Sequence, residues 1–300
     1  MNTYRDIFKW GDKRETQLDE GTLKIIKERF GYAESDFNQK HLFGDKKISL
    51  DKDCNLEEKI LEDLTDIVGE DNIKTDDFSR VSHAHGKYYS ELLKLRKGEV
   101  LTPPDAVLFP RNEDDIVKII ELCNKKNIAI TPYGGNSSVT RGVETPKGGI
   151  SLDLTRHLNK VLEVNEINST ATVQSGMYGP AFESYLNNYG QKYSCGHFPQ
   201  SFEYSTVGGW VAAKGAGQAS TGYGKIEHMV LSVRVVTPKG IIETKTYPAS
   251  AQGWDLHQLF FGSEGTLGVI TRVTMKIRKY RPNQAKHASF IFKNFESAVA

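Results

Sequence analysis

The chain has 300 residues, enough for a substantial core and about two domains, and its 39 basic and 38 acidic side chains leave a formal net charge of +1. This balance argues against a nucleic-acid surface or an acidic tail, and three widely spaced cysteines (Cys54, Cys123, Cys195) argue against a disulfide framework or a zinc site. Without a long apolar run or a secretory signal, the sequence predicts a soluble, cytoplasmic protein with no transmembrane segment.

The first hundred residues are charged and prone to form helices. Apolar residues recur at helical spacing between Leu56 and Val68, so we interpret residues 1–100 as an amino-terminal helical arm. His83 and His85 lie in the segment SHAHGKYY. Two histidines without nearby carboxylates or cysteines in the sequence are more typical of packing than of metal binding, so we predict no metal site.

The segment LTPPDAVLFP, residues 101–110, begins a different pattern. Its prolines end the preceding helix, and residues 107–109 are predicted to form a strand. Asn112 can cap a helix whose apolar face includes Ile116 and Cys123. A second strand over residues 128–130 leads into the loop PYGGNSSVTRGV, residues 132–143. Because α/β sheets bind ligands at the carboxyl ends of strands, this loop is a candidate site.

The composition of that loop favours a phosphate ligand. Two adjacent glycines, an asparagine and two serines allow successive backbone N–H groups to point into one concavity. Gly-Gly-Asn is also ordinary turn chemistry, and most glycine-rich loops bind nothing. Two similar segments favour the phosphate interpretation: SFEYSTVGGWVAAKGAG at 201–217 and GSEGTLGVIT at 262–271. The three loops are predicted to converge on one long polyanionic ligand such as a pyrophosphate.

Two familiar nucleotide fingerprints do not fit the sequence. The Rossmann pattern G-x-G-x-x-G is only approximated, at residues 215–220, where no clear strand precedes it and the third glycine is missing. A Walker loop requires Ser or Thr after Gly-Lys, whereas the two Gly-Lys pairs precede Tyr88 and Ile226. ATP binding of the P-loop kind is therefore not predicted.

The remaining elements predict an α+β domain in two lobes, with the glycine loops between them. Short strands are expected at 150–154, 161–164 and 171–174, a helix at 180–188, a hairpin at 230–237 and 241–244, and an alternating strand at 268–278. A strand at 290–292 and a helix capped by Asn294 follow. Because domains seldom end at the start of a helix, we expect a fragment that lacks a following domain.

With these three loops the chain resembles the FAD-linked oxidases of the vanillyl-alcohol oxidase type, and within them the alkyldihydroxyacetonephosphate synthase family. PYGGNSS matches the family loop P-I-G-G-G-T-S, with Asn136 in place of the third glycine. QSFEYSTVGGW is similar to D-S-x-E-[FY]-S-T-V-G-G-W, and Glu264–Thr271 matches E-G-T-L-G-V-I-T without change. Further similar segments are Lys9–Asp12, residues 80–99 and residues 235–243.

The resemblance implies a two-lobed PCMH-type FAD-binding domain over residues 101–281. The helical arm of residues 1–100 precedes it, and residues 282–300 begin an incomplete cap domain. Covalent attachment in this fold often uses a histidine near the glycine loop, and residues 132–143 contain none, so noncovalent FAD is expected.

The resemblance also implies the residues that contact FAD. The pyrophosphate contacts are Pro132, Tyr133, Gly134, Gly135, Asn136, Ser137 and Ser138. The ribityl and ring contacts are Gln200, Ser201, Ser205, Thr206, Gly208 and Gly209. A looser match to the family's T-R-A-S gives Ala213, Lys214, Gly215 and Ala216. Backbone contacts are Glu264, Gly265, Thr266, Leu267, Gly268, Val269 and Ile270. Alternatively, Gly265 and Gly268 only turn the chain into its last strand.

The family exchanges the acyl chain of acyl-dihydroxyacetone phosphate for an alkyl chain, an ether-lipid reaction of a FAD-dependent transferase or oxidoreductase. Its catalytic residues lie in later domains, so none is assigned here and the chain is expected to be inactive alone. A small-molecule or lipid substrate would bind through the missing domain; a homodimer and peripheral membrane association are left open. The alternatives are a FAD-dependent 2-hydroxy-acid dehydrogenase of the lactate or glycolate type and a catalytically incomplete flavin-binding fragment.

Overall fold

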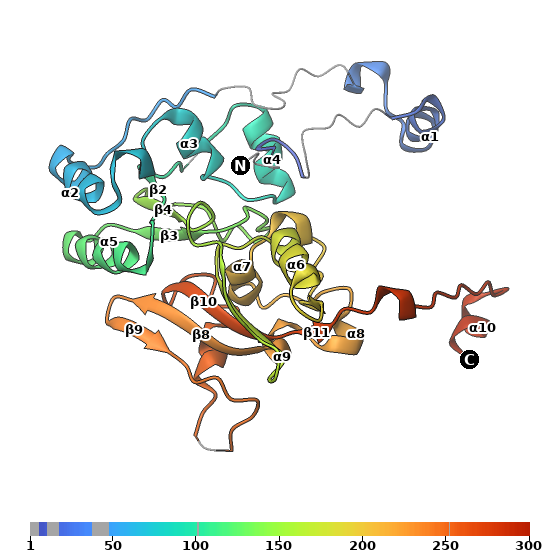
Figure 1. The fold of residues 1–300 in the computed structure, drawn as a ribbon. Helices are drawn as coiled ribbons and strands as arrows, with labels where there is room; N and C mark the ends of the chain where they lie inside the picture. The colour runs from blue at the N-terminus through green and yellow to red at the C-terminus, as the bar shows by residue number, and fades with distance from the viewer. Residues whose placement is uncertain (1–5, 11–17, 38–47, 101, 252) are drawn as a thin grey trace.

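The computed structural model describes residues 6–10, 18–37, 48–100, 102–251 and 253–300 (Figure 1). Gly11, Asp12 and Leu101 lie outside the described residues. The helices and strands form the two-lobed α+β arrangement that the sequence predicts. One lobe contains a four-stranded sheet of order β1-β2-β4-β3, and the other contains a five-stranded sheet of order β5-β6-β10-β8-β9.

The helices of the described residues are α1 (Glu20–Phe30), α2 (Glu58–Val68), α3 (Asp77–Ser82), α4 (Tyr89–Arg96), α5 (Glu113–Lys126), α6 (Gly179–Asn188), α7 (Val207–Ala212), α8 (Ser220–Tyr223), α9 (Ile226–Met229) and α10 (Phe295–Val299). The strands are β1 (Ile73–Lys74), β2 (Ala106–Leu108), β3 (Ile130–Tyr133), β4 (Ile150–Asp153), β5 (Val161–Asn165), β6 (Thr170–Gln174), β7 (Tyr193–Ser194), β8 (Val230–Thr237), β9 (Gly240–Glu243), β10 (Val269–Lys276) and β11 (Arg278–Lys279).

The first lobe is built on the unit β2-α5-β3. The Asn112 side chain accepts a hydrogen bond from the backbone N–H of Asp115 at 2.9 Å and caps α5 as predicted. β2 and β3 both pair parallel to β4, while β1 pairs antiparallel to β2. The apolar face of α5 shares one core with the buried face of α2. Residues from before position 100 therefore complete the sheet and the core of this lobe.

The second lobe is an antiparallel sheet covered by α6, α7 and α9. β10 lies at its centre, between β6 and β8, and Val273 and Met275 are completely buried. The strict alternation predicted for this strand is wrong: most of its residues are buried, its pairing with β8 is irregular, and Val269 packs into the core of the first lobe while Ile270 packs into that of the second. The predicted hairpin of β8 and β9 is confirmed by the pairing of Val236 with Ile241. The buried residues of this sheet and its covering helices form the largest core of the described chain.

The two lobes are joined by apolar packing and by a polar contact. Val236 and Val269, from the second sheet, are buried in the core of the first lobe. Beside them the Arg234 guanidinium Nε lies 2.8 Å from a carboxylate oxygen of Glu113 in the first turn of α5. The Thr271 hydroxyl donates a hydrogen bond to the same carboxylate at 2.5 Å. These contacts hold the first turn of α5 against the central strands of the second lobe.

Residues 282–300 extend away from both lobes and are exposed (Figure 1). Asn294 caps α10 as predicted, because its side chain accepts a hydrogen bond from the backbone N–H of Ser297. The strand predicted at residues 290–292 is wrong: these residues have no regular structure. A strand is stabilised by pairing with a neighbour, and no described strand pairs with this segment.

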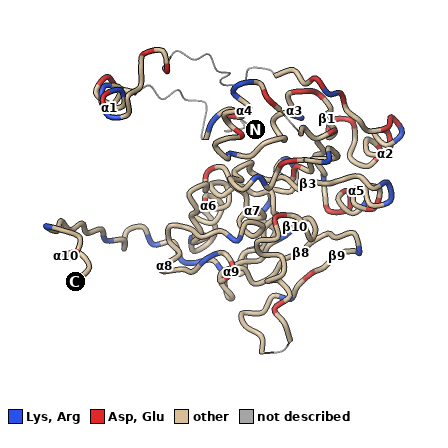
Figure 2. The backbone as a smooth tube through the Cα atoms, turned by 180° about the vertical axis from the view of Figure 1, so that it is seen from behind, with Lys and Arg blue, Asp and Glu red and all other residues tan. Residues whose placement is uncertain are grey.

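Charged residues of both signs are interspersed over the elements, as expected from the balanced composition (Figure 2). No helix of the described residues combines the length and the apolarity that crossing a membrane requires.

Substituting Glu113 with Gln is expected to lower the free energy of unfolding. The amide keeps the shape of the side chain but removes the charge that pairs with Arg234 between the lobes. We expect a loss of roughly 1–3 kcal/mol in urea denaturation. Glu121→Gln, at an exposed position on the same helix, is the control and should change stability little. Equal stability of the two variants would show that the contact between the lobes contributes nothing.

Candidate functional site

The predicted loops surround a cavity of about 390 Å³ between the two lobes. Its walls come from the carboxyl end of β3, the turn that leads into α7 and the turn that leads into β10. The cavity therefore lies where the sequence places a ligand, at the end of a parallel strand in the first lobe.

The first loop continues directly from β3. The strand was predicted over residues 128–130 but spans Ile130–Tyr133. Pro132 and Tyr133 are therefore its last two residues, and both line the cavity. Tyr133 is buried, and its hydroxyl donates a hydrogen bond to the Ser82 carbonyl oxygen at 2.9 Å. This bond fixes the start of the loop to the end of α3.

Gly135 allows the first loop to touch the second. A β-carbon at this position would lie 1.9 Å from the Tyr204 carbonyl oxygen and 2.7 Å from the Cα atom of Ser205. Both neighbours are backbone, so neither can move away as a flexible side chain would. Any residue larger than glycine at position 135 must push the two loops apart.

Two residues of this loop have a positive φ, Asn136 at 59° and Arg141 at 65°. Glycine adopts this conformation freely, and asparagine is one of the few other residues that tolerate it. The replacement of the family's third glycine by asparagine is thus compatible with the loop conformation. The Asn136 side chain is 5% exposed, and its carbonyl oxygen Oδ1 has no hydrogen-bond partner.

The second loop is fixed by its own hydroxyl groups. The Thr206 side chain caps α7 by accepting a hydrogen bond from the Gly209 backbone N–H at 3.3 Å. The Ser205 hydroxyl accepts a hydrogen bond from the Trp210 indole N–H at 2.7 Å and donates one to the Ser201 carbonyl oxygen at 2.8 Å. The hydroxyl groups of Ser205 and Thr206 therefore stabilise the conformation of this loop through hydrogen bonds.

The third loop enters the cavity through two residues with positive φ, Glu264 at 50° and Gly265 at 80°. A β-carbon at Gly265 would lie 3.0 Å from the ring of Pro132, so this loop also packs against the first. Burial raises the pKa of the Glu264 carboxyl group, and a hydrogen bond with Thr140 opposes that rise. The third loop is thus more than a turn into β10, since it closes one side of the cavity.

Most of the predicted residues line this cavity. From the first loop these are Pro132, Tyr133, Gly134, Gly135, Asn136, Ser137 and Ser138. From the second and third loops they are Ser201, Ser205, Thr206, Gly208, Gly209, Ala213, Gly215, Glu264, Gly265, Gly268 and Ile270. The residues Gln200, Lys214, Ala216, Thr266, Leu267 and Val269 are not among the lining residues. Val269 packs in the core of the first lobe instead.

Sequence reasoning assigned no role to several residues of the cavity wall. These include Val139, Thr140, Gly142, Val143, Leu154, Ser175, His197, Pro199, Trp210 and Ala212. Val139, Thr140, Gly142, Val143, Trp210 and Ala212 lie inside the predicted loop segments, and His197 and Pro199 lie just before the second segment. Leu154 and Ser175 could not have been found from these loops, because only the packing of β4 and β6 brings the segments that follow them to the cavity.

His197 is the most informative of these residues. Its side chain is 1% exposed, neither ring nitrogen has a hydrogen-bond partner, and its ring lies 4.9 Å from the Trp210 ring. Burial lowers the pKa of His197 to about 4, although the negative charge of Glu227 opposes the shift. The imidazole is therefore neutral at pH 7, with one nitrogen able to donate and the other to accept.

Three lining side chains of the described chain carry buried polar atoms without a partner: Asn136, Ser175 and His197. Buried polar atoms normally have a hydrogen-bond partner, and each one left without a partner calls for an explanation. Polar atoms that surround a cavity find partners when a polar ligand fills it. The cavity therefore fits a ligand that combines polar groups with an apolar body, since Leu154, Trp210 and Ile270 also line it.

Comparison with known proteins identifies that ligand. A family described as an FAD binding domain matches residues 104–245. An alkyldihydroxyacetonephosphate synthase of Trypanosoma brucei brucei is 39% identical over 250 residues, 81% of this chain and 40% of the relative. A cytochrome-linked mitochondrial D-lactate dehydrogenase of Arabidopsis thaliana is 34% identical over 212 residues, 70% of this chain and 35% of that relative.

The fold is also similar to that of an alkyldihydroxyacetonephosphate synthase. A solved structure of an alkyldihydroxyacetonephosphate synthase superposes with a TM-score of 0.80 at 29% identity, covering 91% of this chain and 53% of that structure. The chain thus spans about half of the structure it matches and two fifths of its first sequence relative. The cofactor of the matched family is FAD, as the loops predict.

Substituting Gly135 with Ala is expected to abolish FAD binding. The added methyl group would force apart the backbones of the first and second loops. Titration of FAD into the refolded variant, followed by flavin fluorescence, should show an affinity at least about a hundredfold weaker than that of the parent, equivalent to roughly 3 kcal/mol.

Two controls accompany this variant. Gly222→Ala adds a methyl group where a β-carbon would meet nothing within 4 Å, so it should retain FAD affinity. Asn136→Gly places the unstrained residue at the positive φ and should bind FAD at least as well as the parent. Unchanged affinity in Gly135→Ala would refute the close contact of the two loops.

The pH dependence of stability should contain a contribution from His197. The unfolded chain protonates this residue below about pH 6.5, whereas the folded ring stays neutral until the pH falls to about 4. The unfolded state then binds more protons, so stability falls as the pH drops through this window, by on the order of 3 kcal/mol. His197→Leu should lose less stability than the parent between pH 7 and pH 4.5 in urea denaturation. Parallel pH profiles would contradict the neutral, buried ring.

Proposed function

Residues 104–245 match an FAD binding domain, and from this premise we propose that the chain is the flavin-binding portion of a flavoenzyme similar to the alkyldihydroxyacetonephosphate synthases. The observation that carries the proposal is the convergence of three separate glycine loops on one cavity lined by partnerless polar atoms. The likeness to the synthases extends over 81% of the chain in sequence, well beyond the matched domain.

The first loop is proposed to hold the pyrophosphate. Residues 134–138 line the cavity with backbone that is not part of a helix or strand, so its N–H groups are free of ladder pairing. Hydrogen bonds from such groups to an anion contribute roughly 1.5–3 kcal/mol each. Because Gly134 and Gly135 have no side chains, the pyrophosphate can approach the loop backbone closely.

The second and third loops are proposed to hold the ribityl chain and the ring. When bound, FAD would supply the reactive flavin ring, while the protein supplies position and shelter from water. Trp210, Leu154 and Ile270 provide apolar walls. Ser175 and His197 provide buried polar atoms that have no hydrogen-bond partner in the protein. The neutral His197 ring can orient a ligand group by donating from one nitrogen and accepting at the other.

The reaction class follows from the relatives rather than from the cavity. We infer an exchange of an acyl chain for an alkyl chain on dihydroxyacetone phosphate, because the synthases match both the sequence and the fold of this chain. A 2-hydroxy-acid dehydrogenase is the second candidate, favoured by the likeness to a D-lactate dehydrogenase. The identity is higher and the covered share larger for the synthase, which favours the first candidate.

The lipid substrate, a homodimer and a cytoplasmic location belong to the same proposal. The location rests on the cysteine usage. The substrate and the dimer rest on the likeness to the synthases.

The purified chain is expected to bind FAD reversibly, one molecule per chain. The cavity is lined by backbone, hydroxyl groups and apolar side chains, and residues 132–143 contain no histidine for covalent attachment. Absorption spectra of the FAD-saturated protein, followed by acid precipitation, measure both properties. All flavin should appear in the supernatant. Yellow colour in the pellet would refute noncovalent binding, and no uptake of added FAD would count against the whole proposal.

A further inference from the structure

A second group of functional side chains lies outside the cavity. The sequence pattern predicts packing roles for His83 and His85, although Glu91 follows His85 by only six residues. The structure brings carboxylates to both: Asp153 lies 3.1 Å from His83, and Glu91 lies 3.7 Å from His85. Glu144, from the segment that follows the first glycine loop, completes a cluster with the second pair. We call His85, Glu91 and Glu144 the His–Glu cluster.

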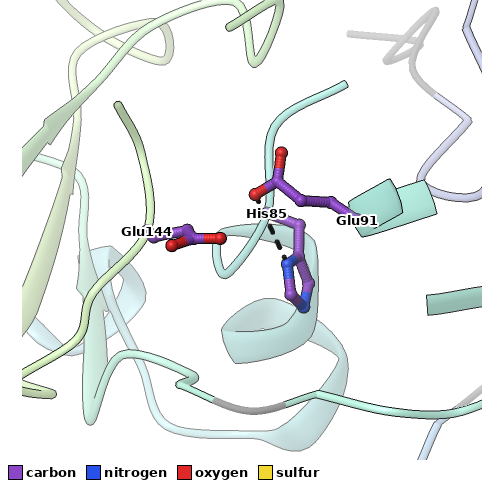
Figure 3. Close-up of side chains that lie close together, drawn as sticks. All are labelled: His85, Glu91 and Glu144. Carbon is purple, nitrogen blue, oxygen red and sulfur yellow. Dashed lines mark ion pairs between the residues drawn. The ribbon is translucent and has the colours of Figure 1, made fainter. Parts of the chain in front are cut away.

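The three side chains converge on one point from separate parts of the fold (Figure 3). One donor atom from each, a ring nitrogen or a carboxylate oxygen, lies within 4.8 Å of the other two. His85 lies in the connection between α3 and α4, and Glu91 lies in the first turn of α4. Glu144 lies in the connection between β3 and β4. The cluster therefore joins the part of the chain before residue 100 to the segment that carries the first glycine loop.

An independent observation indicates that a ligand is needed in the cluster. His85 is 5% exposed and Glu91 is 3% exposed, yet both ring nitrogens and both carboxylate oxygens lack a hydrogen-bond partner. The separation of 3.7 Å between His85 Nδ1 and Glu91 Oε1 is too long for a good hydrogen bond. A buried carboxylate without partners is costly, and a second carboxylate nearby adds repulsion. A cation between the three side chains relieves both costs.

We propose that the His–Glu cluster binds a divalent transition-metal ion, with Zn²⁺ as the best match. Imidazole nitrogen and carboxylate oxygen are both zinc donors, and the remaining coordination position would be left to water. Donor atoms about 2.1 Å from a tetrahedral ion lie about 3.4 Å apart. The distance of 3.7 Å between His85 and Glu91 is close to that spacing, and all three donor atoms lie within 4.8 Å of one another, so the side chains would move inward to bind the ion.

A neighbouring arginine supports one of these ligands from outside. The Arg141 guanidinium donates two hydrogen bonds of 2.8 Å to the two oxygens of Glu144. Each carboxylate oxygen has a second lone pair, so Glu144 can bind the ion while it remains paired with Arg141. Metal-binding carboxylates are commonly held in this way by an outer partner.

The ion would fix the connection between α3 and α4 to the first glycine loop. The two segments already touch: the Lys87 backbone N–H donates to the Ser138 carbonyl oxygen at 2.6 Å, and a β-carbon at Gly86 would lie 2.4 Å from the same oxygen. Ser138 is a residue of the cavity wall. The metal is therefore a structural tie behind the loop, and its binding does not depend on the proposed flavin function.

The test uses the full chain without an affinity tag, freed of metal with a chelator and titrated with Zn²⁺ by calorimetry. We expect one ion per chain, a higher melting temperature on Zn²⁺ addition and visible absorption bands when Co²⁺ replaces Zn²⁺. His85→Gln and Glu91→Gln should weaken binding by more than the roughly 10–100-fold typical of losing an outer partner. His287→Gln, at an exposed position, is the matched control and should bind Zn²⁺ as the parent does.

Glu144→Gln keeps the test decisive if the variants at the buried positions do not fold. The Glu144 side chain is 18% exposed, so the substitution is tolerated more easily, and it should also weaken Zn²⁺ binding and remove the Co²⁺ bands. No Zn²⁺ uptake by the folded parent would overturn the proposal. So would equal uptake by the parent and all folded variants of the cluster, since the ion would then lie elsewhere.

Discussion

The contact between two backbones, at Gly135 and at Tyr204–Ser205, is the constraint on which the site depends. The first loop follows a parallel strand of one lobe, and the second leads into a helix that packs on the sheet of the other. A β-carbon at Gly135 would lie 1.9 Å from the Tyr204 carbonyl oxygen, so only glycine permits this contact. The cavity wall is continuous because the loops meet without side chains between them.

The two lobes position these loops through features that lie away from the cavity. The first lobe holds β3 by its parallel pairing with β4, and α5 together with α2 from the preceding segment forms its core. The second lobe holds α7 against β10 through its apolar core. Glu113, Arg234 and Thr271 connect the two. The loops can therefore be rich in glycine and hydroxyl residues, because the sheets supply the stability that such loops lack.

Local patterns predicted most elements, and tertiary contacts decided the rest. Asn112 and Asn294 were recognised as caps because a cap depends on residues three positions apart. The strict alternation expected for β10 was wrong, because the strand packs against both lobes and its pairing with β8 is irregular. The strand at 290–292 failed because pairing depends on a partner that the described chain does not supply. Most of the predicted loop residues line the cavity. The role of Gly135 could not be read from the sequence, because it depends on the close contact with the Tyr204 backbone. A positive φ lies at the next residue, Asn136. Glu144 was missed as a neighbour of His85 because it is distant in sequence, whereas Glu91 lies only six residues after His85 and could have been considered.

Hydrogen–deuterium exchange with and without FAD tests whether the three glycine loops hold the cofactor jointly, because it reports on each loop separately. The account predicts that FAD slows exchange in three segments that are far apart in sequence, residues 134–142, 201–215 and 262–268. Exchange in the β8–β9 hairpin and in α1 should not change, because these elements lie outside the cavity wall. Protection of one loop alone, or protection confined to other elements, would contradict a cofactor held jointly by the three loops.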